Sequence, residues 1–174
     1  MKRILLFTMM LMCCFAIAQA QQATILDVNK TSTVNVIIDF SKASIHNMTE
    51  SEFAEYEEDF YKDMPELKSK LIHDFNRAKN VDFVIGSFPS AVYTLKIEIL
   101  YVGLKGDIMS NSTIVDSEGN VIAEVKDLYA KGGHIGTKLN LIGDGMYRTG
   151  KLLSRSLGSM IMEQEEILSQ CQRI

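Results

Sequence analysis

The fold is decided by the stretch Tyr93-Thr94-Leu95-Lys96-Ile97-Glu98-Ile99-Leu100-Tyr101, followed by a polar run and then by Val121-Ile122-Ala123-Glu124-Val125. In the first segment, apolar residues at every second position alternate with Thr94, Lys96 and Glu98. This period of two is typical of a strand with one buried face. We therefore expect Ile97 to point into the core and Lys96 into solvent.

A tight turn separates the polar run from the third segment of this stretch. The sequence Asp116-Ser117-Glu118-Gly119-Asn120 has the composition of a hairpin loop, in which Gly119 can adopt a positive φ. Three strands joined by tight connections form an antiparallel meander. Such a meander has one apolar face and one solvated face.

Helical patterns lie on both sides of the meander. Thr49 and Glu52 form a capping box before an apolar stripe with three- and four-residue spacing. Pro65 removes a backbone donor inside this stripe, which predicts two helices, over about 50–62 and 64–79. A last helix is expected over about 146–168, after the opening Gly143-Asp144-Gly145 and with Leu168 on its buried side.

Two further strands are predicted, over 33–40 and 81–85. The polar residues 21–32 read as a flexible leader, so that residues 33–174 form a single domain. The predicted fold class is α+β, in two layers, with a mostly antiparallel sheet and amphipathic helices packed on one face.

Residues 1–20 have the pattern of a secretory signal peptide. Lys2 and Arg3 precede the apolar run Ile4–Ala18, and Ala18-Gln19-Ala20 fits the small-x-small cleavage rule. An apolar run of about 15 residues is shorter than the roughly 20 that span a bilayer, which disfavours a retained anchor. A lipoprotein would use Cys13 or Cys14. We expect cleavage after Ala20 instead, because neither cysteine follows a small residue.

The composition of residues 21–174 disfavours several kinds of partner and site. Residues 21–174 carry 16 basic and 22 acidic side chains, a formal net charge of −6, which disfavours nucleic acid or an anionic membrane as main partner. Cys171 is their only cysteine, so they allow neither an internal disulfide nor a multi-cysteine zinc site. Cys171 is either an accessible thiol able to pair between chains or a small residue packed on the core.

Motifs with catalytic chemistry are weak in this sequence. Gly132-Gly133-His134-Ile135-Gly136 lacks the lysine and spacing of a phosphate loop and reads as a flexible connection. The other histidines, His46 and His73, have no metal-ligand spacing relative to His134 or to each other. We therefore predict no catalytic, metal-binding or cofactor-binding residues, and no cofactor.

Acidic residues on or next to the predicted strands are the one set of side chains that a hydrolase could use. Asp39, Asp82 and Glu98 could meet as a carboxylate pair in the folded chain. Strand alternation alone also places acids on the solvated face of a sheet, and we favour this simpler interpretation.

The signal ending Ala18-Gln19-Ala20-Gln21 resembles those of exported proteins of Bacteroides-type bacteria. The strand at 34–40, the capped helix and the meander resemble small cell-envelope α/β domains related to the periplasmic part of the curli-secretion lipoprotein. Many of those families have no known function. The resemblance covers most of residues 33–162 and implies no catalytic residue. The chain lacks the acylated mature cysteine and the membrane-inserting hairpins of the lipoprotein, so no pore is implied.

These observations predict a periplasmic or secreted, non-catalytic cell-envelope protein that binds a partner or assists assembly. The partner would be another envelope protein or a second copy of this chain, with an association with the outer membrane. The alternative is a periplasmic protein that binds a small molecule or a lipid, and a hydrolase is the weakest reading.

The first prediction concerns export. We expect the exported protein to begin at Gln21, because the signal has a small-x-small site and no small residue before either cysteine. N-terminal sequencing and intact-mass measurement of the exported protein check this. An acylated Cys13 or Cys14, or a retained Met1, would contradict it.

Overall fold

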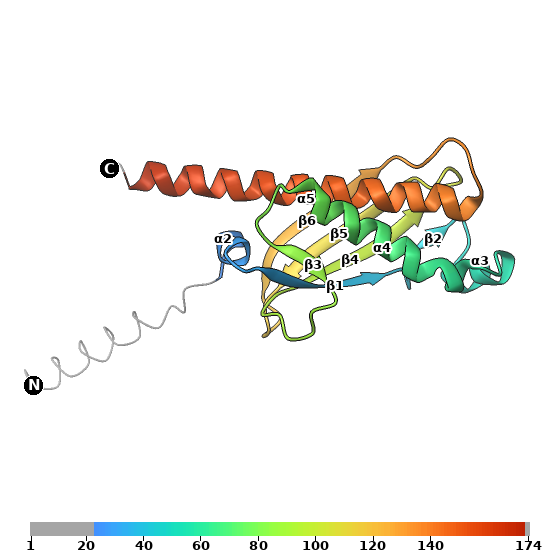
Figure 1. Ribbon diagram of the computed structural model, residues 1–174, viewed down its shortest axis with the longest axis horizontal. Helices are drawn as coiled ribbons and strands as arrows, with labels where there is room; N and C mark the ends of the chain where they lie inside the picture. The colour runs from blue at the N-terminus through green and yellow to red at the C-terminus, as the bar shows by residue number, and fades with distance from the viewer. Residues whose placement is uncertain (1–22, 173–174) are drawn as a thin grey trace, which may run out of the picture.

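The computed structural model describes residues 23–172, so the predicted signal at 1–20 lies outside the described residues. Ten helices and strands follow one another along the described chain (Figure 1). They are α2 (Ile25–Asn29), β1 (Thr33–Asp39), β2 (Ser44–Ile45), α3 (Glu50–Tyr56), α4 (Phe60–Ala78), β3 (Val84–Gly86), β4 (Thr94–Val102), β5 (Ile108–Val115), β6 (Val121–Ala130) and α5 (Lys138–Cys171).

The strands form one mixed sheet in the order β3-β1-β4-β5-β6, with the short β2 beside β4. The predicted meander is confirmed, since β4–β5 and β5–β6 pair antiparallel. β1 pairs parallel with both β3 and β4, because the helical crossover through α3 and α4 returns the chain in the same direction. The α+β class is therefore confirmed, in a sheet that combines both kinds of pairing.

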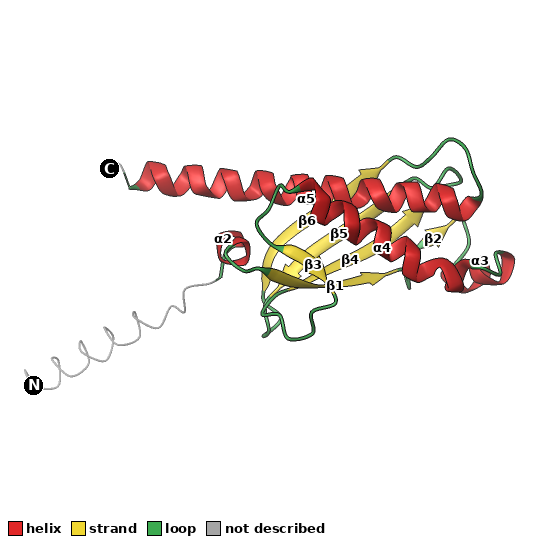
Figure 2. Ribbon diagram, viewed as in Figure 1, coloured by secondary structure: helices red, strands yellow, loops and turns green. Residues whose placement is uncertain are grey.

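The alternation in β4 is confirmed residue by residue. Leu95, Ile97 and Ile99 are at most 1% exposed, whereas Lys96 between them is exposed. Figure 2 shows α4 and α5 lying along one face of the sheet. The core between them contains Leu71 and Leu153, both fully buried.

The last helix is longer than the sequence pattern predicts. α5 begins at Lys138, after Thr137 whose hydroxyl accepts a hydrogen bond from the Asn140 backbone N–H. Gly145 lies inside the helix, because a Cβ there would overlap the Gly106 carbonyl oxygen. The predicted start near 146 was wrong, since this glycine permits close packing and does not end or open a helix.

The break between the two central helices lies at residues 57–59 and not at Pro65. The capping box of Thr49 and Glu52 is confirmed at the start of α3. α3 ends at Tyr56 with no basic residue in its last turn, so acids crowd the end of the helix that disfavours them. Pro65 is the sixth residue of α4, so it removes one intrahelical hydrogen bond without ending the helix.

The predicted leader is structured from Thr24 onward. Thr24 and Asp27 form a capping box at the start of α2, and Ile25 and Val28 are buried in the core. This segment is held by apolar burial, which its mixed composition does not reveal. None of the helices in residues 23–172 combines the length and apolar character needed to cross a bilayer.

The second prediction tests the alternation in β4. We expect Ile97→Ala to lower the free energy of unfolding by about 2–5 kcal/mol, as large-to-small changes in a core do. Lys96→Ala is the matched control and should change it by no more than about 0.5 kcal/mol, because this side chain is exposed. Urea unfolding followed by circular dichroism measures both. Equal losses for the two variants would contradict the assigned faces.

Candidate functional site

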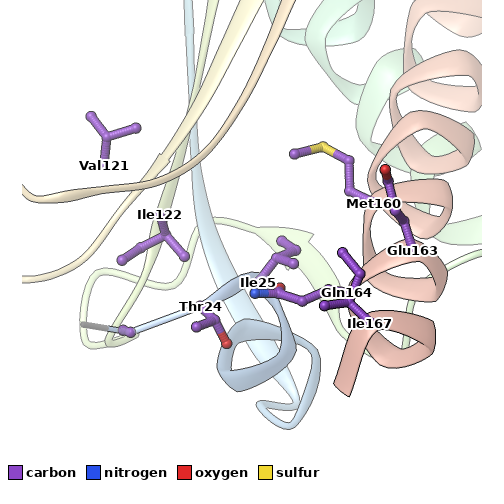
Figure 3. A pocket seen from close by; sticks show the side chains of 9 residues that line it. Thr24, Ile25, Val121, Ile122, Met160, Glu163, Gln164 and Ile167 are labelled. Carbon is purple, nitrogen blue, oxygen red and sulfur yellow. The ribbon is translucent and has the colours of Figure 1, made fainter. Parts of the chain in front are cut away.

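An apolar groove brings together three segments that are far apart in the sequence. α2, the beginning of β6 and the distal half of α5 form its walls (Figure 3). Its volume is about 450 Å³. The lining residues are Ala23, Thr24, Ile25, Val121, Ile122, Met160, Glu163, Gln164 and Ile167.

The groove has a buried floor and exposed apolar rims. Ile25 is only 5% exposed and anchors α2 to the core. Val121 and Ile167, on β6 and α5, are 53% and 54% exposed. Large apolar side chains that stay half exposed around a hollow mark a surface able to bind apolar groups.

The distal segment of α5, residues 160–171, carries further exposed apolar side chains. It runs out beyond the sheet toward the C-terminus (Figure 1). Met162 and Leu168 expose 64% and 49% of their surface. The prediction that Leu168 marks the buried side of the last helix was therefore wrong, because the sheet ends before this turn is reached.

The distal segment is also acidic. Glu163, Glu165 and Glu166 are exposed, and residues 156–172 contain no lysine or arginine. Within residues 23–172, none of the three glutamates forms an ion pair. Of these three glutamates, Glu163 lines the groove.

Two of the three acids proposed for a hydrolase lie side by side. Asp39 on β1 is the register partner of Glu98 on β4. Glu98 is ion-paired with Lys42 at 2.7 Å. Asp39 accepts a hydrogen bond from the Ser41 backbone N–H at 2.9 Å, and this bond lowers the pKa of Asp39. A carboxylate held in its charged form is poorly suited to donate a proton.

Asp82 does not join this pair. It contacts Asn29, whose side-chain amide donates to Asp82 Oδ2 at 3.0 Å. The neighbouring Val84 pairs with Thr33, which is six residues from Asp39 along β1, or about 20 Å for an extended strand. The three acids therefore do not form one site.

The open face of the sheet carries a second hollow, with a volume of about 470 Å³. Asp39 and Glu98 line it together with Lys96, Asn111 and Thr113. These side chains offer donors and acceptors on the solvated face that the alternation predicts. Ile37, Val115 and Val121 also line it, so this hollow combines polar and apolar side chains, as the groove beside α5 does.

The three histidines lie apart from one another. His46 is 9% exposed and sits in the turn after β2, where its ring lies 5.0 Å from that of Phe53. His73 on α4 and His134 in the loop before α5 are exposed. No group of three metal-ligating residues occurs within the described part of the chain.

The glycine-rich loop and the cysteine were also assigned from sequence. The Gly132 backbone N–H donates to Asp107 Oδ1 at 2.8 Å, and Arg148 donates to the Lys131 carbonyl at 2.7 Å. These bonds fix the start of the loop, whereas Ile135 further along is 90% exposed, and the flexibility of the connection stays a prediction. Cys171 is an exposed free thiol, which rules out its packing on the core; pairing between chains stays a prediction.

Comparison with known proteins gives only remote structural likenesses. Neither a protein-family model nor a curated protein matches the sequence. A Xanthomonas campestris protein of the DUF330 family is 12% identical with a TM-score of 0.37, over 60% of this chain and 65% of that chain, so less than two thirds of it is spanned. A dodecameric PelC variant from Paraburkholderia phytofirmans is 16% identical with a TM-score of 0.36, over 71% of this chain and 88% of that chain.

The groove itself was not predicted from the sequence. Its residues come from the supposed leader, the end of a hairpin and the far part of the last helix. The available signal was the position of Ile167, which falls outside the buried stripe through Leu153, Leu157 and Ile161. Large apolar residues off the buried face of a helix indicate a second contact surface.

The third prediction concerns His46. Burial, and secondarily the charge of Lys138, lower the pKa of His46. The unfolded chain, with an ordinary histidine pKa of about 6.5, therefore takes up the proton more readily than the folded protein. Stability is fully present above that value and should fall as the pH drops through it.

Urea unfolding at pH 8 and pH 5.5 measures this effect. His46→Phe keeps an aromatic contact with Phe53 and removes the titration, so it should lose less stability at pH 5.5 than the unaltered protein. His73→Gln, at an exposed histidine, is the control and should lose as much as the unaltered protein. An identical pH dependence in all three proteins would contradict the assignment.

Proposed function

We propose that this chain is an exported, non-catalytic cell-envelope protein that binds another protein through the groove beside α5. The observation that carries the proposal is the pair of half-exposed apolar side chains Val121 and Ile167, which line the groove from β6 and α5, with the exposed Leu168 next to Ile167. Apolar patches of this kind mark interaction sites on otherwise well-packed domains. The resemblance of the sequence to exported envelope domains supports the location.

The proposal treats the domain as two layers. The helices occupy one face of the sheet, and the solvated face carries polar and charged residues such as Lys96 and Glu98. At the border between the layers, where α2 meets α5 and β6, the groove is lined by apolar side chains such as Ile25, Ile122 and Met160. A partner segment would therefore enter at this border.

A second candidate function is the binding of a small polar molecule in the exported compartment. The hollow on the open sheet face favours it, since its volume lies within the usual range of ligand pockets. The charged state of Asp39 and the ion pair of Glu98 favour binding over hydrolysis there.

The fourth prediction tests the favoured function by photo-crosslinking in the native envelope. Benzoylphenylalanine in place of Ile167 should crosslink to one defined protein. The control places the same group at Leu104, which is 70% exposed at the opposite end of the sheet, and should not capture that protein. Leu168→Ser should lower the yield roughly fivefold, as expected for the loss of about 1 kcal/mol at an interface.

Two outcomes would contradict this function. One is the absence of a crosslink from position 167. The other is the same product from positions 167 and 104, because such capture would not depend on the groove. Melting curves of the Leu168→Ser protein establish that the variant is folded.

A further inference from the structure

We propose that α3 is released from the domain in acid, with His46 as the group that controls the release. α3 lies at the end of the molecule opposite the C-terminus of α5, so this device is separate from the groove and does not depend on the proposed function (Figure 1). The inference follows from the few contacts that hold α3, from the burial of one ring nitrogen of His46 and from the non-helical residues on both sides of the helix.

A single buried side chain docks α3 on the domain. Phe53 is the one residue of α3 that is buried. Its ring lies 5.1 Å from that of Phe60 at the start of α4 and 5.0 Å from the ring of His46, edge to face with both. α4 and α5, in contrast, bury side chains over several turns. Segments with few buried contacts are the ones that open while the rest of a domain stays folded.

A second tie to α3 comes from the start of α5. The Lys138 ammonium donates to the Tyr56 hydroxyl at 2.7 Å and lies 3.5 Å from the Glu57 carboxylate. Tyr56 is 58% exposed, and ion pairs at a protein surface contribute little to stability. The packing of Phe53 against its two aromatic neighbours therefore contributes most of the docking.

The docked form requires a neutral His46 ring. The Nε2 atom of this ring is buried and has no hydrogen-bond partner within residues 23–172. The hydrogen bond between His46 and the Gly103 backbone therefore uses the other ring nitrogen, Nδ1. Protonation of Nε2 would bury a charged N–H group without an acceptor, and burying an unpaired charge is costly.

The groups around His46 act on it in both directions. Burial, and secondarily the ammonium of Lys138 from the start of α5, lower the pKa of His46. The hydrogen bond to Gly103 in the loop after β4 and the carboxylate of Glu57 after α3 raise it by less. The net effect keeps the ring neutral at pH 7 while Phe53 packs against it.

The direction of the pH effect follows from this shift. With α3 released, the His46 ring meets water and has the ordinary histidine pKa of about 6.5. The released form therefore takes up a proton more readily than the docked form, and acid increases its population. For each pH unit below about 6.5 the increase is up to tenfold, until the pH reaches the lowered pKa of the docked form.

Non-helical residues on both sides allow α3 to move alone. Residues 46–49 join it to β2, and residues 57–59 join it to α4. The backbone N–H of His46 donates to the last residue of β4 at 2.9 Å, which holds this histidine on the sheet. Release therefore separates Phe53 from His46 and uncovers the ring of Phe60, so acid exposes an aromatic surface at this end of the domain.

The helix cap of α3 keeps its charge in the pH range concerned. The Thr49 backbone N–H donates to the Glu52 carboxylate at 2.8 Å, and this bond lowers the pKa of Glu52. The capping box therefore persists at pH 5.5. The other histidines, His73 on α4 and His134 in the loop before α5, are exposed, and variants at both serve as controls.

The fifth prediction uses hydrogen–deuterium exchange of the purified protein at pH 7.5 and pH 5.5, followed by mass spectrometry of its peptides. Each exchange rate is divided by the intrinsic chemical rate at the same pH. We expect the corrected exchange of the α3 amides to rise at least twofold, and at most about tenfold, from pH 7.5 to pH 5.5. The amides of α4 and β4 should change less than twofold, because these elements stay packed.

Variants at His46 identify the controlling group. His46→Phe keeps an aromatic contact with Phe53, and His46→Asn suits the backbone φ of 53° at this position. Neither side chain titrates, so both variants should lose the pH dependence of α3 exchange, and either one decides if the other does not fold. His73→Gln and His134→Gln should keep it.

Three results would overturn the inference. One is corrected exchange in α3 that changes less than twofold between the two pH values. Another is an equal rise in α3, α4 and β4, because that is unfolding of the whole domain. The third is a rise that persists in the folded His46 variants or disappears in His73→Gln or His134→Gln. None of these results bears on crosslinking from position 167, which tests the proposed function separately.

Discussion

The structure depends on the close contact between α4 and α5. A Cβ on Gly150 would overlap the Leu71 carbonyl oxygen, so only glycine lets the two helix backbones approach at this point. A glycine inside a helix costs about 1 kcal/mol relative to alanine. Each large apolar side chain buried between helices and sheet contributes roughly 1.5–3 kcal/mol, so Phe75, Leu153 and Leu157 more than offset that cost.

This contact also explains why the groove exists. α4 and α5 run side by side until Gly158 reaches Asn80, just beyond the end of α4. α5 continues for 13 more residues, about 20 Å of helix, past the layer that buries its earlier turns. α2 contacts α5 near this point and leaves a hollow against the start of β6. The part of α5 beyond Gly158 therefore packs against the rest of the domain on one side only.

Several elements could be predicted because their cause is local. The alternation of β4, the capping box at Thr49 and the turn around Gly119 each depend on residues within a few positions of one another. β5 was harder to read, since two of its core-facing positions are Ser110 and Ser112, both at most 1% exposed. The glycines of α5 and the proline of α4 were misread because local rules treat them as helix breakers, whereas packing and position in the helix decide their effect.

The sequence by itself determined the α+β class, the meander and which face of β4 is buried, because side-chain period and turn chemistry are properties of adjacent residues. Only the tertiary structure decided where α5 begins, that α2 joins the core, and that Asp39 meets Glu98 while Asp82 lies apart. It also placed Glu163 and Ile167 of α5 in one groove with Ile25 of α2. That arrangement depends on contacts between residues more than 100 positions apart, for which no local pattern exists.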